Sequence, residues 1–436
     1  MPGLGMVRAT FFGVTYAVQR ALNELRQTME DPSGFLRSLF DTAIAVAQPA
    51  LCVPPNLPSP PVGRTLVIGA GKASAAMAAA VETHWDGPLE GVVVSRYGFA
   101  QACEQIEVLE ASHPIPDAAG LAAAKKILAL VEDLSSDDLV LCLVSGGGSA
   151  LLTLPAGDIT LHDKQMVNEM LQRCGAPISE INTVRKHLSA VKGGRLGAAC
   201  APSRLHTLII SDVPGDDPAM VSSGPTIPDS SLPSDALAVL VKYDLRVPAS
   251  VRRHLTDQVP EPVRVANASH YVIASARQSL EAAAAVGSRQ GLGVTILGDA
   301  IEGDARRVGQ DMARRVQAPE ERPHLYLSGG ETTVKLSGSG TGGPNTEFLM
   351  GLALELNGAA GIHALACDTD GIDGSGDNAG ALVTPDTLRR AAAAGLDPGK
   401  MLDNNDAYGF FAGLGDLVIT GPTHTNVNDF RAILVE

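Results

Sequence analysis

Short apolar runs alternate with segments of helical periodicity along most of this 436-residue chain. In the first half we expect strands at 65–68, 91–95, 106–109, 139–144 and 205–210, and helices at 35–47, 72–82 and 117–134. Short apolar strands separated by helices of about 10 to 15 residues are typical of parallel crossovers. The pattern therefore predicts an α/β fold with a parallel, doubly wound sheet.

A second series of the same kind begins near residue 270. We expect strands at 271–274, 294–297, 325–327, 362–366 and 417–419, and helices at 279–290, 304–316 and 346–356. A stretch dotted with prolines, 225–262, stands between the two series and is the predicted boundary. We therefore expect an N-terminal extension over 1–34, one α/β domain over 35–230 and a second over 231–436.

The charge and the cysteines exclude several classes of protein. The chain has 33 Lys and Arg against 48 Asp and Glu, a formal net charge of −15. An acidic surface repels nucleic-acid phosphates and anionic lipid, so we expect neither as a partner. The apolar stretch 9–18 is too short to span a bilayer, and the six cysteines include no C-x-x-C pair. These features predict a cytoplasmic protein with reduced thiols.

Glycine-rich loops follow three of the predicted strands. Gly69, Gly71 and Lys72 follow the first strand, Ser145-Gly146-Gly147-Gly148-Ser149 follows the fourth, and Gly329-Gly330-Glu331 follows the strand at 325–327. Glycine at a strand end lets the backbone approach a ligand, and its amide groups attract anions. The loops therefore favour phosphate binding, although turn chemistry alone explains each of them in isolation.

The first of these loops does not match the known nucleotide fingerprints. Ser74 stands where a dinucleotide motif has its third glycine, and the next strand ends in Ser95 and Arg96 rather than in an acidic residue. Arg96 leaves an NADP enzyme open. The chain contains no G-x-x-x-x-G-K-[ST] sequence, which excludes a P-loop.

Charged residues gather in three further segments. Arg185, Lys186, Lys192 and Arg195 form a cationic cluster that could hold a carboxylate or phosphate, unless they are a solvated helical face. The acidic segments are 211–217, which contains Asp212, and 368–373, which contains Asp370 and Asp373. Carboxylates at strand ends can hold Mg²⁺ or act as a general base, and Asp-Gly turns are the simpler interpretation. These features together favour an α/β enzyme that handles phosphate and transfers phosphoryl groups.

The motifs also resemble a known family. VIGAGKAS, SHPIPD, LVSGGGSALL, INTVRKHLSAVKGGRL, SDVPGDDPAMVSSGPT, LSGGETTV, CDTDGIDG and ITGPTHTNVND occur in the order seen in the class II glycerate kinase family, whose members are often called hydroxypyruvate reductases. The resemblance covers the chain from about residue 35 to its C-terminus. The part from about residue 321 onward resembles the MOFRL domain of that family.

The resemblance implies an ATP- and Mg²⁺-dependent kinase that phosphorylates D-glycerate, in this class usually to 2-phosphoglycerate. It also implies a Rossmann-like first domain, a second α/β domain with a mixed sheet, and an active site between them. Lys72 matches the functional lysine of the family. Relatives often carry arginine where this chain has Thr341 and Pro344, so the role of that loop is in question.

Our hypothesis assigns roles to residues from both series. The catalytic residues are Lys72, Asp212, Asp370 and Arg195, and the substrate-binding residues are Arg185, Lys192, Ser149 and Asn345. Nucleotide phosphates contact Gly69, Gly71, Ser145, Gly146, Gly147, Gly148, Gly329, Gly330 and Glu331, and the metal ligands are Asp212, Asp370 and Asp373. Of Asp212 and Asp370, either one could bind metal while the other accepts the hydroxyl proton.

Two other functions remain open at this point. A reductase of hydroxypyruvate or tartronate semialdehyde would bind NAD(P)H, and a non-catalytic sensor of sugar acids would bind glycerate without turning over ATP. We expect D-glycerate as the small-molecule partner, and the sequence leaves a homodimer open.

Overall fold

A computed structural model describes residues 30–257, 263–318 and 322–436, which form two compact units. We call residues 47–275 and 424–427 the parallel-sheet unit. The mixed-sheet unit contains residues 276–423 and 428–436 together with the described residues up to Val46. Most of the predicted extension, 1–29, lies outside the described residues, and its last residues enter the first described helix.

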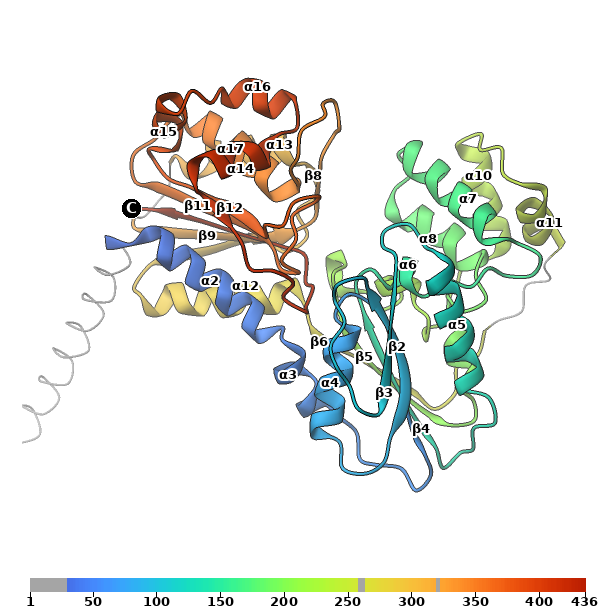
Figure 1. Ribbon diagram of the computed structural model, residues 1–436. Coiled ribbons are helices and arrows are strands. Elements are labelled where there is room, and N and C mark those ends of the chain that lie inside the picture. Colours follow the sequence, from blue (N-terminus) through green and yellow to red (C-terminus); the bar gives the residue numbers. More distant parts are fainter. Residues whose placement is uncertain (1–29, 258–262, 319–321) are drawn as a thin grey trace, which may run out of the picture. The chain divides into compact units, whose positions relative to one another are not determined.

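The parallel-sheet unit is built on a sheet of six parallel strands in the order β3-β2-β1-β4-β5-β6 (Figure 1). The strands are β1 (Thr65–Ala70), β2 (Glu90–Arg96), β3 (Ile106–Ala111), β4 (Leu139–Ser145), β5 (Arg204–Ile210) and β6 (Ala268–Ala274). This is the strand order of a dinucleotide-binding Rossmann fold. The doubly wound α/β prediction is therefore confirmed.

Helices cover both faces of this sheet, which explains why its strands are continuous apolar runs. Leu66 and Ile68 of β1 pack with Ile127 of α5, whereas Val67 packs on the opposite face with Met77 of α4. The helices are α3 (Pro49–Cys52), η1 (Pro54–Asn56), α4 (Ser74–His84), α5 (Ala118–Leu130), α6 (Gly148–Leu151), α7 (Leu161–Arg173), α8 (Ile178–His187), α9 (Arg195–Ala199), η2 (Pro214–Asp216), η3 (Val221–Ser223), α10 (Pro233–Lys242) and α11 (Ala249–Asp257). Helices α7, α8, α10 and α11 share a smaller apolar cluster of their own.

The mixed-sheet unit has six strands in the order β13-β12-β11-β14-β9-β7. Among the described strands of this sheet, only β7 and β9 pair in parallel, and the other neighbours are antiparallel. The strands are β7 (Gly293–Gly298), β9 (His324–Gly330), β11 (Ile362–Asp368), β12 (Gly380–Val383), β13 (Leu417–Val418) and β14 (Asp429–Val435), and β8 (Gly303–Asp304) pairs with β10 (Thr332–Thr333) outside this sheet. The predicted mixed sheet is confirmed.

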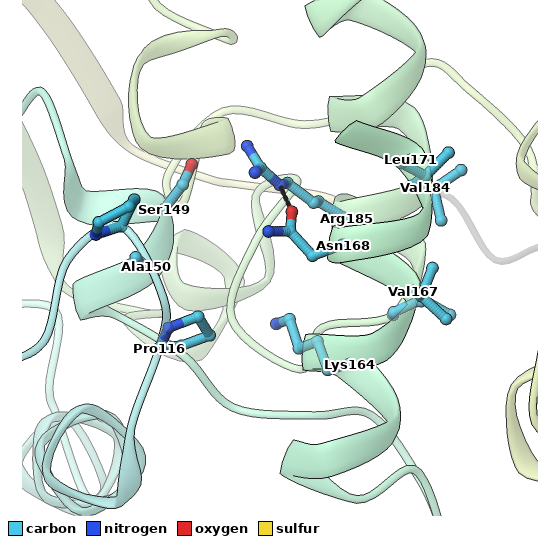
Figure 2. Close-up of a pocket in the computed structure, with 11 residues that line it drawn as sticks. Pro116, Ser149, Ala150, Lys164, Val167, Asn168, Leu171, Val184 and Arg185 are labelled. Carbon is cyan, nitrogen blue, oxygen red and sulfur yellow. Dashed lines mark hydrogen bonds between the residues drawn. The ribbon is translucent and has the colours of Figure 1, made fainter. Parts of the chain in front are cut away.

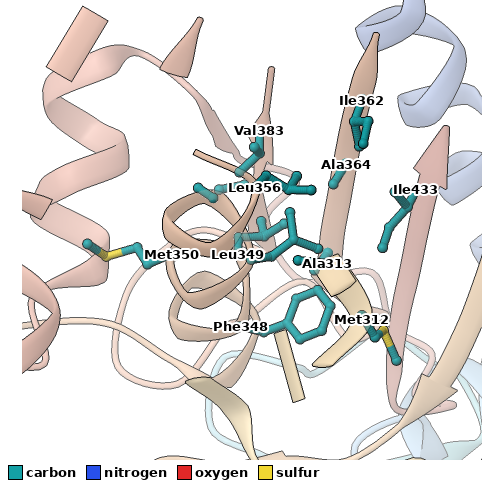
Figure 3. Close-up of a cluster of buried hydrophobic side chains, with 14 of the residues drawn as sticks. Met312, Ala313, Phe348, Leu349, Met350, Leu356, Ile362, Ala364, Val383 and Ile433 are labelled. Carbon is teal, nitrogen blue, oxygen red and sulfur yellow. The ribbon is translucent and has the colours of Figure 1, made fainter. Parts of the chain in front are cut away.

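Two helical layers enclose the mixed sheet. One layer consists of α2 (Pro32–Val46) and α12 (Ala276–Arg289), which pack on the face that carries Phe430, Ala432 and Leu434. The other layer consists of α13 (Ala305–Val316), α14 (Pro344–Leu356), α15 (Thr387–Ala393), α16 (Pro398–Asp403) and α17 (Ala407–Leu414). Figure 3 shows the core under this layer, where Phe348 and Leu349 of α14 meet Met312 and Ile433.

The structure corrects three details of the sequence-based prediction. The strand expected at 271–274 is β6, which pairs with β5 and completes the first sheet instead of starting the second domain. The helix expected at 35–47 is α2, whose apolar side chains pack in the mixed-sheet unit. The chain also returns once more as β14 after the strand at 417–419, which we expected to be the last.

The division between the units consequently differs from the boundary expected at 230/231. Residues 231–275 remain in the parallel-sheet unit because α10 and α11 pack on α8 and α7 and because β6 closes the sheet edge.

Among the described residues, no individual helix has the length and apolar character needed to cross a membrane. One pair of helices, Pro32–Val46 with Pro49–Asn56, meets these criteria only when the two are joined, and it is bent by 49° at the break.

Candidate functional site

The strand order places two of the predicted glycine loops side by side. β1 and β4 are neighbours, and the chain continues from them toward opposite edges of the sheet. Such a switch point leaves a crevice at the carboxyl ends of the strands, where α/β proteins of this kind bind ligands. The loop after β1 begins at Gly71, and the loop after β4 contains Gly146, Gly147 and Gly148.

Hydrogen bonds join the two loops. The Lys72 amide donates to the Gly146 carbonyl at 2.8 Å, and the Ala73 amide donates to Ser145 Oγ at 3.0 Å. The Ser74 hydroxyl donates to the carbonyls of Gly71 and Val94. The Ser145 hydroxyl, which we assigned to phosphate binding, thus joins the two loops. Ser74 anchors the start of α4.

Close packing requires glycine at several positions in these loops. A Cβ on Gly71, whose φ is +145°, would lie 2.0 Å from Ser145 Oγ. A Cβ on Gly146 would lie 1.7 Å from Asp212 Oδ2 and 2.4 Å from the side-chain nitrogen of Asn426, which itself donates to Asp212 at 3.1 Å. The Asp212 carboxylate therefore lies directly against the loop after β4.

The loop after β4 presents backbone amides in the form of an anion site. Gly147 adopts a φ of +81°, and a Cβ there would lie 3.2 Å from atoms of Lys72 and of His113. Within the part of the chain that the structure describes, the amides of Gly147, Gly148 and Ser149 have no hydrogen-bond acceptor. Successive amides around a left-handed residue form a concavity that binds phosphate or carboxylate oxygens. The backbone of this loop therefore has the geometry of an anion site, and its binding of phosphate stays a prediction.

Two serines with left-handed backbone conformations contact the residues at either end of this loop, Ser145 and Ser149. Ser222 and Ser223 have φ values of 53° and 60°, which cost non-glycine residues about 1 to 3 kcal/mol each. The Ser222 hydroxyl donates to the Ser145 carbonyl at 2.7 Å. Ser223 Oγ lies 2.8 Å from Ser149 Oγ and donates to Asn182 Oδ1. Sequence reasoning missed this pair, because nothing in VSSGP reveals a left-handed backbone.

The predicted cationic cluster divides into two groups: Lys186, Lys192 and Arg195 contact carbonyl groups or an aspartate, whereas Arg185 lines a pocket. Lys192 is fully buried, and its ammonium group donates to the carbonyls of Leu152 and Ser222 at 3.1 and 3.4 Å. Arg195 donates to the carbonyls of Lys186 and Lys192, and the Lys186 ammonium group pairs with Asp229 at 3.1 Å. Burial lowers the pKa of Lys192 well below its ordinary value, and nearby Lys164 and Arg185 lower it further. These contacts give Lys192 and Arg195 a role in holding the main chain.

Arg185 and Ser149, both predicted to bind substrate, line one pocket (Figure 2). Lys164 and Asn168 of α7 complete its polar wall, and Asn168 Oδ1 accepts a hydrogen bond of 2.7 Å from Arg185 Nε. Burial lowers the pKa of Lys164 to about 7, and the charge of Arg185 contributes. Sequence reasoning missed Lys164, because a single lysine in a polar helix carries no signal.

In the mixed-sheet unit, Asp373 holds the start of α14. Its carboxylate accepts hydrogen bonds from the amides of Asn345 and Thr346, both at 2.9 Å, and from the Thr346 hydroxyl at 2.8 Å. Burial raises the pKa of Asp373 to about 6, against the effect of these hydrogen bonds. Both oxygens are therefore already engaged, which favours a positioning role over the predicted role as a metal ligand.

A buried ion pair lies beside this helix start. Asp429 and Arg431 alternate with core residues on β14 and point to the α14 side of the sheet. Arg431 bonds to the Asp429 carboxylate and to Thr332 Oγ1, and its guanidinium carbon lies 5.2 Å from the centre of the Phe348 ring. Asn345, predicted to bind substrate, instead donates to Asp429 Oδ1 at 2.6 Å. Burial raises the pKa of Asp429, and Arg431 opposes that shift.

Asp370 lies in a tight acidic turn next to this pair. The Ile372 amide donates to Asp370 Oδ1 at 2.9 Å, and the Asp370 amide donates to Asp368 Oδ1 at 2.9 Å. The charge of Asp370 contributes to the raised pKa of Asp429, so the two carboxylates lie close together. Across residues 30–257, 263–318 and 322–436, no three His, Cys, Asp or Glu side chains form a metal-binding group. Mg²⁺ often takes only one or two protein carboxylates and completes its shell with water and phosphate, so Asp370 still fits it.

The third glycine loop differs from the prediction. Gly329 and Gly330 belong to β9 and pair with Phe430 and Asp429 of β14, so they form part of the sheet rather than a loop beyond it. A Cβ on Gly330 would lie 2.2 Å from the Ile301 amide, which explains the glycine by packing. Pro344, in the loop whose role the sequence left in question, occupies the first turn of α14, where its missing amide costs nothing.

Substitution of Gly146 tests the close approach of Asp212. We expect Gly146→Ala to lower the free energy of unfolding by about 1 to 3 kcal/mol, because the added methyl group overpacks the Asp212–Asn426 contact. Urea denaturation measures the change. Gly399→Ala, where the added Cβ would make only an ordinary contact with Asp397, is the control and should not lower the free energy of unfolding, since alanine is the better helix former in α16. A Gly146→Ala variant as stable as the wild type would contradict the packing.

Removal of Arg431 tests the buried pair. We expect Arg431→Met to lower the free energy of unfolding by about 3 to 5 kcal/mol, because it leaves the Asp429 carboxylate buried without its partner. The matched control is Arg314→Met, which breaks a pair of 2.9 Å with Glu355 in which the arginine is 57% exposed and which should cost less than about 1 kcal/mol. Equal losses in chemical denaturation would show that burial of the pair is irrelevant.

Comparisons with known proteins agree with these features. Residues 35–256 match a domain model described as a domain of unknown function, DUF4147, and residues 324–429 match the MOFRL family. A protein of Agrobacterium vitis, provisionally named a hydroxypyruvate reductase, is 52% identical and the match covers 94% of this chain and 96% of the relative. A D-glycerate 2-kinase of Thermotoga maritima is 37% identical, with 92% of this chain and 98% of the relative covered.

A solved structure of a glycerate kinase is also similar to this chain over most of its length. The crystal structure of a glycerate kinase from Thermotoga maritima superposes with a TM-score of 0.84 at 35% identity, covering 93% of this chain and all of that one. The sequence matches and the structural similarity each cover more than nine-tenths of this chain. The chain therefore belongs to the class II glycerate kinase family, whose C-terminal part is the MOFRL domain.

Proposed function

We propose that this protein is a glycerate kinase that transfers the γ-phosphoryl group of ATP to D-glycerate. The observation that carries the proposal is the concavity of three backbone amides, those of Gly147, Gly148 and Ser149, at the switch point of the parallel sheet beside Lys72. Relatives named as glycerate kinases match more than nine-tenths of the chain and support the choice of substrates. We assign 2-phosphoglycerate as the product, following the name of the Thermotoga maritima relative.

The chemistry asks the protein mainly to position groups and to neutralise charge. A hydroxyl oxygen of D-glycerate attacks the γ-phosphorus, the bond to ADP breaks, and the hydroxyl proton leaves to a carboxylate. In this proposal the amides of the loop after β4 hold phosphate oxygens, and the Lys72 ammonium group neutralises charge that develops on the transferring group. We assign Asp212, whose carboxylate lies against Gly146, as the group that accepts the proton.

Asp370 is the residue that we propose as a ligand of Mg²⁺. The ion, when bound with ATP, neutralises the phosphate charge and orients the phosphoryl group. Asp370 contributes one carboxylate from the turn after β11, and the hydrogen bond from the Ile372 amide orients that group. Whether Asp212 and Asp370 exchange these two roles stays open to test. The site between the two domains that the family resemblance implies stays a prediction.

A second candidate function follows from the relative in Agrobacterium vitis, provisionally named a hydroxypyruvate reductase. A reductase would bind NAD(P)H at the loop after β1. Ser74 occupies the position of the third glycine there and its hydroxyl is engaged with main-chain carbonyls, which disfavours a dinucleotide. One coupled assay with ATP, Mg²⁺ and D-glycerate, together with a fluorescence titration of NADH and NADPH, separates a kinase, a reductase and a non-catalytic sugar-acid sensor.

We also propose that the protein works in the cytoplasm. A homodimer, which the sequence allowed, stays a possible oligomeric state. All six cysteines are free in the structure, which suits a reducing compartment.

Substitution of Lys72 tests its role in neutralising charge. We expect Lys72→Ala to lower kcat about a hundredfold or more, because the site loses a preorganised charge near the transferring group. Steady-state assays of ADP release measure the effect, and circular dichroism verifies the fold. Lys125→Ala, at an exposed position of α5, is the control and should retain wild-type kinetics. A near-wild-type rate for Lys72→Ala would remove the residue from the mechanism.

Substitution of Asp370 tests the proposed metal ligand. We expect Asp370→Asn to raise the Mg²⁺ concentration for half-maximal velocity by about tenfold or more, because an amide oxygen binds the ion less well than a carboxylate. Asp403→Asn, which alters a 75% exposed carboxylate, should leave the Mg²⁺ titration unchanged. An unchanged titration for Asp370→Asn would exclude this carboxylate from the metal shell.

A further inference from the structure

The pocket between α7, α8 and α6 carries two cations that the proposed phosphoryl transfer does not use. Lys164 and Arg185 lie on one side of the pocket and Ser149 and Pro116 on the other (Figure 2), and Pro114 also contributes to the lining. None of the described residues that line this pocket carries a carboxylate. The pocket is therefore positively charged, in a protein whose net charge is −15.

Lys164 is a buried amine without a counter-charge, and burial lowers its pKa to about 7, so that it is a cation mainly below that pH. Its side chain is 6% exposed, and its ammonium nitrogen has no hydrogen-bond partner among the residues that the structure describes. The charged groups that face it are also cations, Arg185 on α8 and Lys192 before α9. A buried ammonium group normally finds a partner, because leaving it unpaired costs several kcal/mol. The missing partner at this position points to an anionic ligand.

Ser149 connects this pocket to the proposed phosphate loop. Its side chain lines the pocket, and its amide belongs to the concavity of Gly147 and Gly148. An anion that contacts Lys164 and Arg185 therefore lies next to the loop that we propose for the phosphates of ATP. A substrate that accepts a phosphoryl group needs this arrangement, with its charged end anchored and its hydroxyl beside the donor.

We propose that the Lys164–Arg185 pocket binds the carboxylate of the acceptor substrate, a short hydroxy acid, and leaves the hydroxyl end next to Ser149. The inference rests on the proposed kinase function and assigns the anchor that selects a carboxylic acid. Arg185 can present its planar guanidinium to both oxygens, with its orientation held by Asn168. Lys164 adds a second charge-assisted hydrogen bond.

The walls of the pocket favour a carboxylate on a short carbon chain over a phosphate group. The lining residues Val167, Leu171 and Val184 are apolar, and so are the two lining prolines. A phosphate ion presents oxygens on all sides and would turn some of them toward these walls without hydrogen bonds. A carboxylate has two oxygens on one side, which match the two cations, and its carbon chain suits the apolar surface.

Direct binding of small anions to the full-length protein tests the pocket without ATP. Calorimetry with D-glycerate is compared for the wild type, for Lys164→Met and for Lys400→Met, whose lysine is 86% exposed in the mixed-sheet unit. We expect Lys164→Met to weaken D-glycerate binding by about tenfold or more, the scale for losing a charged hydrogen bond, and Lys400→Met to bind like the wild type. Glycerate affinity within about twofold of the wild type in Lys164→Met would overturn the proposal.

The pH dependence of the wild-type protein gives a second test that needs no variant. Because burial lowers the pKa of Lys164 to about 7, this lysine loses its proton as the pH rises from about 6 to about 9. The carboxylate of glycerate remains ionised over this range. The Kd for D-glycerate should therefore rise about tenfold or more between about pH 6 and pH 9. An affinity that does not change with pH would contradict a role for Lys164.

Two further measurements separate a carboxylate site from a phosphate site, and the pocket from the kinase activity. Binding of inorganic phosphate that depends on Lys164, with glycerate binding unaffected, would overturn the assignment to a carboxylate. Glycerate binding that requires Lys164 without any ATP turnover supports the pocket and contradicts the kinase. A higher KM for glycerate with little change in kcat is the pattern expected for Lys164→Met in an active enzyme.

Discussion

The contact between the ends of β1 and β4 is the interaction on which the candidate site depends. Main-chain and hydroxyl groups of Lys72, Ala73, Ser145 and Gly146 are joined by hydrogen bonds of 2.8 and 3.0 Å, and glycine is the residue that permits this approach. The position of the Lys72 backbone and the shape of the amide concavity are therefore set by one local network. The proposed chemistry uses groups whose positions are determined by the sheet itself rather than by a flexible loop.

In the mixed-sheet unit, charged side chains rather than closely packed glycines hold the candidate residues in position. Asp429 and Arg431 lie in the middle of a sheet, where burying ions costs free energy, and they bond to each other, to Asn345 and to Thr332. Asp373 adds the start of α14 to the same network. The acidic turn that contains Asp370 follows β11, whose last residue, Asp368, pairs with Asp429 of β14.

The fold was largely predictable, whereas the site was predictable only in part. Buried parallel strands are continuous apolar runs, so β1 to β5 could be recognised one by one, and glycine loops marked the ends of β1 and β4. β14 was missed because DFRAILV carries two ions inside a strand, and periodicity treats an ion as a surface residue. Lys192 and Lys164 show the limit for cations: sequence alone does not tell a lysine that holds carbonyls from one that lacks a partner among the described residues.

Ser222 and Ser223 illustrate how the site limits evolution. Glycine at either position would relieve the strain of a left-handed backbone. The same change would remove a hydroxyl that supports the loop after β4 or contacts Ser149. A lineage selected only for thermal stability should therefore drift toward glycine here. The serines are expected to persist where growth depends on the activity, which makes these two positions a record of selection for function over stability.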